Sequence, residues 1–194
     1  SFKEKFLFKK FSLKNIIIEN NILLKDKVIK ILLTEIYDNN LIFLKNKKIE
    51  VALMSNSLIE SFEVKKKYPD TIIIKIFEKK PIAILQDKKN KFYISEKIDL
   101  IKFDSIKINN DLPYVIGSQK NFKLFYRDLK KINFPMSHVK KFIYYESDRW
   151  DLQTINKKTV KLPSKNYLES IKNYLNLKND KNFENYKVFD YRIK

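Results

Sequence analysis

Apolar positions in the first eighty residues recur with two different periods, and together they predict five elements. Strict alternation is typical of half-buried strands, whereas spacings of three and four residues are typical of helices. In the last of the predicted strands Ile72, Ile74 and Ile76 share one face. The predicted elements are a strand at 11–18, helices at 25–35 and 45–55, and strands at 62–66 and 71–77 joined by a turn at 68–70. Their order, β-α-α-β-β, is that of a small α+β layer.

The pattern changes after Pro81, where we predict a domain boundary because the residue before a proline is pushed to an extended conformation. Beyond it Phe122, Phe125, Tyr126 and Leu129 have the spacing of the buried face of a helix. We predict strands at 82–86, 91–95, 100–103, 139–145, 149–155, 159–162 and 186–193, helices at 119–131 and 165–176 (the second capped by Ser164), a loop at 112–117 and a polar linker at 179–185. The expected fold class is therefore α+β, and its second domain has mostly antiparallel strands with two or three helices.

Composition adds that the chain can bury a core. Hydrophobic residues make up 44% of it and aromatic residues 14%, which argues against disorder. Glycine occurs once, at Gly117, so we expect Asn and Asp to form most of the turns that need a positive φ. Cysteine is absent, which excludes disulfides and thiolate metal sites.

The net charge of +18 makes a nucleic-acid-binding module one alternative function. However, Lys outnumbers Arg 38 to 3, and the chain also carries 27 Ile and 19 Asn, a bias typical of an AT-rich genome. Proteins that read bases or clamp phosphates favour the planar Arg guanidinium. The Gly-containing aromatic strand motif of an RNA-recognition fold is also missing. We therefore interpret the charge as surface solvation and expect no nucleic-acid partner.

Several motifs follow one another along nearly the whole chain. The most specific is the aromatic-Pro turn Tyr68-Pro69, which leads into a strand that continues as Glu78-x-x-Pro81-x-Ala83. The others are Val64 with Lys66, Leu112-Pro113 with Gly117, Arg149-Trp150-Asp151-Leu152, Lys161-Leu162-Pro163 and Phe189-Asp190-Tyr191-Arg192. This ordered set resembles the FtsQ/DivIB family of bacterial cell-division proteins. The resemblance implies a membrane-proximal stem at 1–10, a POTRA domain at 11–80 and a β domain at 81–194.

The same resemblance implies a function without catalysis and without cofactors. Proteins of this family are single-span inner-membrane proteins whose folded part lies in the periplasm at the division septum. They bind the thin membrane proteins FtsB and FtsL and help to control septal peptidoglycan synthesis. We expect the stem Ser1–Lys10 to follow a transmembrane helix that this sequence does not include. A periplasmic chaperone or transport arm is the alternative POTRA function, but such arms carry tandem POTRA repeats and no second copy is visible here.

The resemblance also suggests three sets of site residues. The first is the final strand, which in the family accepts a partner segment by strand addition; Arg192 could pair with a partner carboxylate, and Ile193 stands where some members carry a Tyr. The second is Arg149 with Trp150, where alternation directs Arg149 to the face opposite a Trp that more simply anchors the core. The third, used for recruitment, is the POTRA strand. The candidate residues are Asp190, Tyr191, Arg192, Ile193, Arg149 and Trp150 for partner binding, and Ser61, Val64 and Lys66 for recruitment.

No catalytic or metal site is expected. His138 is the sole histidine, and neither a second His nor a Cys can join it to bind a metal. Ser137 is adjacent to His138 in the chain, which is the wrong geometry for an activated serine. A single glycine cannot build a phosphate-binding loop. Glu78 is better explained as a structural hydrogen-bonding residue at the domain junction.

Overall fold

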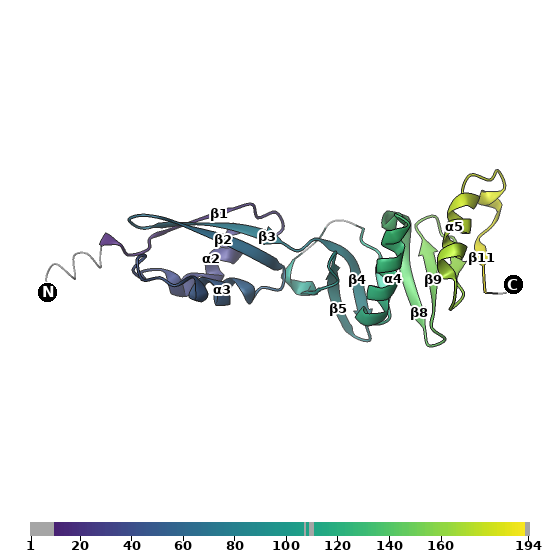
Figure 1. The fold of residues 1–194 in the computed structure, drawn as a ribbon, viewed down its shortest axis with the longest axis horizontal. Helices are drawn as coiled ribbons and strands as arrows, with labels where there is room; N and C mark the ends of the chain where they lie inside the picture. The colour runs from purple at the N-terminus through teal and green to yellow at the C-terminus, as the bar shows by residue number, and fades with distance from the viewer. Residues whose placement is uncertain (1–9, 107, 109–110, 193–194) are drawn as a thin grey trace. The chain divides into compact units, whose positions relative to one another are not determined.

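The computed structural model describes residues 10–106, 108 and 111–192. Contacts within it divide the chain into two compact units. The first runs up to Lys80 and also takes in Ile101–Ile108, whereas the second consists of Pro81–Leu100 and the chain that follows residue 108 (Figure 1). The sequence did not predict that Ile101–Ile108 would belong to the first unit. In that segment the Lys102 N–H donates to the Ser57 hydroxyl.

The first unit contains the elements that the sequence predicts, in the predicted order. They are β1 (Asn15–Glu19), α2 (Asp26–Leu32), the short 3₁₀ helix η1 (Thr34–Ile36), α3 (Asn46–Met54), β2 (Ile59–Lys67) and β3 (Thr71–Glu78). The three strands form one sheet in the order β1-β3-β2, in which β1 runs parallel and β2 antiparallel to β3. This is the POTRA-type arrangement.

The core of the first unit lies between that sheet and its two helices. Ile72, Ile74 and Ile76 of β3 are fully buried, which confirms that they share the inner face. They pack on the side of the helices, whose Ile49 and Leu53 are equally inaccessible. Each fully buried aliphatic side chain contributes about 1.5–3 kcal/mol relative to an exposed one. The period-2 alternation of β3 thus determines which face of the sheet the helices cover.

The second unit is rich in strands. Its elements are β4 (Pro81–Asp87), β5 (Asn90–Ser95), β7 (Tyr114–Ile116), α4 (Gln119–Lys131), η3 (Met136–His138), β8 (Val139–Tyr145), β9 (Arg149–Thr154), β10 (Thr159–Lys161), α5 (Tyr167–Leu177), η4 (Phe183–Asn185) and β11 (Val188–Asp190). Strand β6 (Leu100–Lys102) begins at the last residue before the segment Ile101–Ile108, and η2 (Phe103–Ser105) lies within that segment. Most bounds agree with the sequence pattern. Three differ: β7 lies where we expected a loop, α5 begins after Asn166 rather than after Ser164, and β11 is shorter than the predicted strand.

The eight strands form one mixed sheet in the order β11-β10-β9-β8-β7-β4-β5-β6. The α+β fold class is confirmed, but the expectation of mostly antiparallel pairing is too simple. The hairpins β4-β5, β8-β9 and β9-β10 are antiparallel, whereas β4-β7, β7-β8 and β10-β11 are parallel. Parallel neighbours need a crossover connection, and a helix provides it for two of these three pairs. α4 connects β7 to β8, and α5 connects β10 to β11.

Aromatic side chains dominate the core of the second unit. Phe122, Phe125, Tyr126 and Leu129 of α4 are all buried, as their spacing predicts. Trp150 of β9 stacks on Phe125, with ring centroids 4.7 Å apart and planes 12° from parallel. In the view of Figure 1, α4 runs in nearly the same direction as β8.

Asparagine and aspartate do replace glycine in the turns. Eight described non-glycine residues have a positive φ, and five of them are Asn or Asp, Asn20 of the early turn included. These side chains tolerate the left-handed region better than others do.

Candidate partner-binding edge

The final strand β11 lies at one end of the eight-stranded sheet. Within the described residues it pairs only with β10, in parallel, with Thr159, Val160 and Lys161 opposite Val188, Phe189 and Asp190. The Tyr191 N–H donates to the Lys161 carbonyl at 3.0 Å and continues this pairing by one residue. One side of β11 is therefore satisfied by the chain itself, and the other side is a sheet edge.

The backbone groups on that free side belong to alternate residues. The Thr159 N–H donates to the Lys187 carbonyl at 2.8 Å, and the Tyr191 N–H donates to β10, so residues 187 and 191 turn their backbone groups inward. Because successive peptide groups of a strand point to opposite sides, Val188 and Asp190 direct theirs outward. The Val188 side chain is also 52% exposed. Added strands are therefore expected to bond to Val188 and Asp190.

Arg192 follows this edge, but its charge is already engaged. Its Nε and Nη2 donate to the two carboxylate oxygens of Asp190 at 2.8 and 2.5 Å, and its backbone N–H donates to the same carboxylate at 3.1 Å. These bonds lower the pKa of Asp190 to about 2. The pair is thus ionised and internally neutralised at neutral pH, so Arg192 does not offer a free cation to a partner.

Arg149 lies on the same face of the sheet as Asp190 and Arg192. Trp150 lies on the other face, as alternation predicts. The Arg149 Nη1 donates to Asp151 at 2.6 Å, and its guanidinium lies 4.1 Å from the centre of the Tyr145 ring. Burial raises the pKa of Asp151, and the charges of Arg149, Arg192 and Lys161 oppose that rise. Asp151, Lys161 and Asp190 are in register across three neighbouring strands. The outer face beside the edge therefore carries alternating, mutually compensated charges.

Trp150 and Tyr191 lie on the other face, in the core. Trp150 is 5% exposed, and Tyr191 packs against the same buried cluster. The Tyr191 hydroxyl is buried and has no hydrogen-bond partner in the described part of the chain. Neither side chain is placed to touch a partner directly, so their contribution would be to support the edge from behind. Ile193, the remaining residue of this set, lies outside the described residues.

A shallow apolar hollow lies next to β11 on the helix side. It has a volume of about 320 Å³ and is lined by Leu177, Asp180, Asn182, Phe183, Tyr186 and Phe189. Tyr186 is 58% exposed and Leu177 40%, whereas Phe183 is buried. Sequence reasoning missed this feature because 179–185 has the composition of a polar linker. The signal that could have revealed it is the aromatic spacing of Phe183, Tyr186 and Phe189.

The recruitment residues lie on β2, an edge strand of the first unit's sheet. Val64 and Lys66 share a half-buried face, and the Lys66 ammonium donates to the Leu44 carbonyl at 2.8 Å. Ser61 follows a bulge and is exposed on the opposite face. The structure thus brings two of the three residues together and separates the third.

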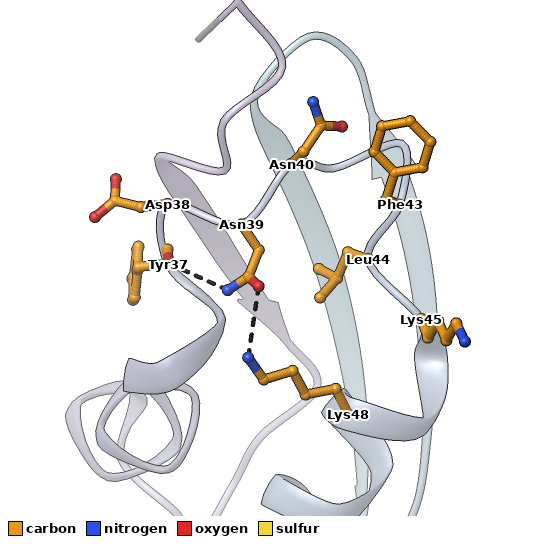
Figure 2. A pocket seen from close by; sticks show the side chains of 8 residues that line it. All are labelled: Tyr37, Asp38, Asn39, Asn40, Phe43, Leu44, Lys45 and Lys48. Atoms are coloured by element: carbon orange, nitrogen blue, oxygen red, sulfur yellow. Dashed lines mark hydrogen bonds between the residues drawn. The ribbon is translucent and has the colours of Figure 1, made fainter. Parts of the chain in front are cut away.

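The first unit also has an open basin, shown in Figure 2, with a volume of about 480 Å³. Its lining residues are Tyr37, Asp38, Asn39, Asn40, Phe43, Leu44, Lys45 and Lys48. The Asn39 amide donates to the carbonyls of Glu35 and Tyr37, and the Lys48 ammonium donates to the Glu35 carbonyl. These polar groups hold the loop together, so their presence around the basin is explained by the structure of the loop.

The described part of the chain has neither a metal site nor a membrane-spanning helix. Among the described residues, no group of three or more His, Cys, Asp or Glu side chains could hold a metal ion. The His138 Nδ1 lies 2.9 Å from the Lys178 ammonium and accepts a hydrogen bond from it, so this nitrogen is already engaged. No helix in the described part of the chain is both long and apolar enough to span a membrane.

Comparison with known proteins identifies the class to which this fold and edge belong. Residues 11–79 match the model of the FtsQ-type POTRA domain, and residues 83–192 match that of the C-terminal domain of cell division protein FtsQ/DivIB. The cell division protein FtsQ of Rickettsia conorii is 30% identical over 189 residues, which cover 95% of this chain and 70% of that protein. FtsQ of Bartonella bacilliformis is 25% identical over 158 residues, 80% of this chain and 51% of that protein.

A solved structure is also similar over half of the chain. It is the major extracytoplasmic domain of the cell division protein DivIB from Geobacillus stearothermophilus, with 18% identity, a TM-score of 0.39 and a coverage of 89% of that domain. The family matches and the relatives together show that this chain belongs to the FtsQ/DivIB family of bacterial cell-division proteins.

Proposed function

We propose that this chain is a non-enzymatic scaffold of the division machinery, which binds a segment of an FtsB- or FtsL-type protein by strand addition to β11. The observation that carries the proposal is the edge position of β11, whose described pairing is with β10 alone. An extended segment added there would gain backbone hydrogen bonds from Val188 and Asp190. This would help to assemble the divisome and to control septal peptidoglycan synthesis.

The surroundings of the edge suggest which side chains the added strand carries. Alternate residues of a strand point to opposite faces of a sheet. On one face lies the apolar hollow of Leu177, Tyr186 and Phe189, which suits a bulky apolar side chain. On the other face the pair Asp190–Arg192 favours a polar side chain that can share its hydrogen bonds. Backbone bonding then supplies most of the affinity, and the hollow sets the register.

Family membership supports three further parts of this proposal. The protein is anchored in the inner membrane by a single span, its folded part lies in the periplasm, and it acts at the division septum. The POTRA edge β2, with Val64, Lys66 and Ser61, serves for recruitment to that site. β2 is itself an edge strand, which makes it open to the same kind of strand addition.

Binding of a peptide from the periplasmic end of the organism's own FtsB-like protein tests the docking edge. Val188→Pro removes an outward-facing N–H and leaves the inward bonds of residues 187 and 191 in place. We expect it to weaken binding about tenfold, the equivalent of about one hydrogen bond. Val188→Thr, which keeps the N–H and the branched side chain, is the matched control and should bind like the wild type. Equal binding by all three proteins in calorimetry would refute docking at β11.

A further inference from the structure

Lys158 is buried, although it lies in a hairpin turn and the chain has many exposed lysines. Only 4% of its surface is accessible. Lysine is almost never buried unless its ammonium is paired, because an unpaired charge is costly to remove from water. The contacts of the Lys158 ammonium must therefore compensate for its burial.

The Lys158 ammonium has three oxygen partners, which match its three protons. It donates to the carbonyls of Phe183 and Tyr186 at 3.1 and 2.9 Å, and it forms an ion pair with Glu184 at 3.2 Å. It also lies 4.5 Å from the centre of the Phe183 ring. All four contacts are with residues 183–186, which contain η4. One side chain thus ties that segment to the β9–β10 hairpin.

The position of the tied segment gives this contact its significance. Residues 183–186 end one residue before Lys187, and β11 begins at the next residue, Val188. Thr159, which follows Lys158 in the hairpin, donates its N–H to the Lys187 carbonyl at 2.8 Å. Two consecutive hairpin residues therefore bind three carbonyls immediately before the edge strand. They place Val188 opposite Thr159, which is the first pair of the β10–β11 register.

Besides the Lys158 contacts, β11 is held by its short ladder to β10 and by the side chains of Phe189 and Tyr191, which pack against the core. Its ladder is three residues long, and Val188 is half exposed. A strand this short and this exposed is expected to open locally unless a neighbouring contact restrains it. Lys158 contributes to this restraint because it binds the segment that carries Phe183, the ring on which Phe189 of β11 stacks.

We propose that Lys158 is a positioning residue for the partner-binding edge: by binding residues 183–186 it fixes the attachment and register of β11. The link to partner binding rests on the function proposed above, whereas the effect on β11 does not. Without the ammonium, β11 would detach from β10 more often, and the outward N–H groups of Val188 and Asp190 would lose their fixed position.

Two features of the contact decide how to test it. The Glu184 side chain is 78% exposed, so its ion pair is screened by water and contributes little. The two carbonyl bonds are less exposed and should dominate. Glu184→Gln therefore serves as the matched control, since it removes the ion pair and keeps the carbonyl bonds. Lys158→Met keeps the length of the buried stem and removes every donor.

Amide hydrogen exchange of the whole chain, followed by NMR, measures the attachment of β11 directly. We expect Lys158→Met to accelerate exchange at residues 189 and 191, whose N–H groups face β10, at least about tenfold relative to β8 and β9 of the same sample. Glu184→Gln should change that ratio by less than about twofold. Because the exchange rates of β11 are divided by those of β8 and β9, a general loss of stability does not affect the ratio. Lys158→Gln keeps a shorter hydrogen-bond donor and should give an intermediate ratio. An unchanged ratio in Lys158→Met would overturn the proposal.

Binding of the same FtsB-derived peptide then separates this proposal from the proposed function. If β11 is the docking edge, Lys158→Met should weaken binding by a factor similar to its effect on exchange. Faster exchange at β11 with unchanged or tighter binding would mean that the peptide pairs elsewhere, for example with an uncovered β10. That outcome would refute docking at β11 and leave the role of Lys158 in positioning the strand intact.

Discussion

Glu78, in the motif that joins the two family-matched regions, offers the sharpest test of the structural argument. Its carboxylate accepts backbone N–H groups from three consecutive residues, Ile22, Leu23 and Leu24, at 3.1, 2.8 and 2.8 Å. The glutamate at the end of β3 thereby holds the turn between β1 and α2. Glu78→Ala removes all three acceptor contacts at once.

The expected cost follows from the exposure of each amide. Hydrogen bonds to charged groups contribute about 1.5–3 kcal/mol when water is excluded, and much less when water can replace them. The amides of Ile22 and Leu23 are exposed, so we assign about 0.5 kcal/mol to each, and about 1 kcal/mol to the partly buried amide of Leu24. The free energy of unfolding of the first unit should fall by about 2 kcal/mol. With a slope of about 1 kcal/mol per M urea, its unfolding midpoint should fall by about 2 M.

Urea unfolding of the whole chain can report the two units separately. Amide NMR signals of β1 to β3 follow the first unit, while the single tryptophan, Trp150, follows the second and should be unaffected. Glu78→Gln keeps one carbonyl oxygen but presents an N–H₂ group to the Leu23 N–H, so it should lose about half as much as Glu78→Ala. A first unit that unfolds at the same urea concentration in Glu78→Ala would refute this account of the motif.

Two further predictions concern the second unit. Gly117→Ala should lower the free energy of unfolding of the second unit by at least about 2 kcal/mol, because φ at Gly117 is +150° and the added Cβ would lie 2.8 Å from the Cβ of Tyr144. Tryptophan fluorescence during urea unfolding measures this loss of stability. A loss no larger than that caused by Lys120→Ala would contradict the prediction. For the Asp190 carboxyl, NMR titration should give a pKa of about 2, so the stabilising pair with Arg192 is present above pH 4 and is lost as the pH falls from about 4 to 2. A pKa near 3.8 in the wild type, unchanged in Arg192→Gln, would show that the pair does not form in solution.

Long periodic segments could be predicted from the sequence because a single amphipathic face determines them. α4 has the predicted bounds, and its four apolar residues at helical spacing are the ones that are buried. β3 is similarly well defined by alternating isoleucines. By contrast, β7 has three residues and follows a proline, so no period can show in it. It becomes a strand because β4 and β8 pair with it from both sides.

Helix α5 and the segment after it show how local signals mislead. Ser164 is a favourable N-cap, yet the helix begins later because Asn166 takes a left-handed conformation, with φ of 58°. The polar composition of 179–185 conceals the buried Phe183, and nothing local marks Lys158 as its partner. Burial of that kind depends on contacts between residues 25 positions apart, which a window of sequence does not contain.

The partner-binding residues suggested by the sequence divide by strand alternation into two roles. Trp150 and Tyr191 support the sheet from the core, whereas Arg149, Asp190 and Arg192 lie on the outer face. The two arginines there are each paired with an aspartate of the same chain.

This pairing changes what the net charge of +18 implies for recognition. Charge attracts a partner over a distance only where it is not compensated locally. Beside β11 the carboxylates of Asp151 and Asp190 neutralise Arg149 and Arg192, so these two arginines add little net charge to the edge. A partner segment that pairs with β11 therefore has little to gain from net acidity and much to gain from a free backbone and one apolar side chain. Recognition at this edge should depend on hydrogen-bonding geometry, and for that reason the position of β11 matters more than the charge of the residues around it.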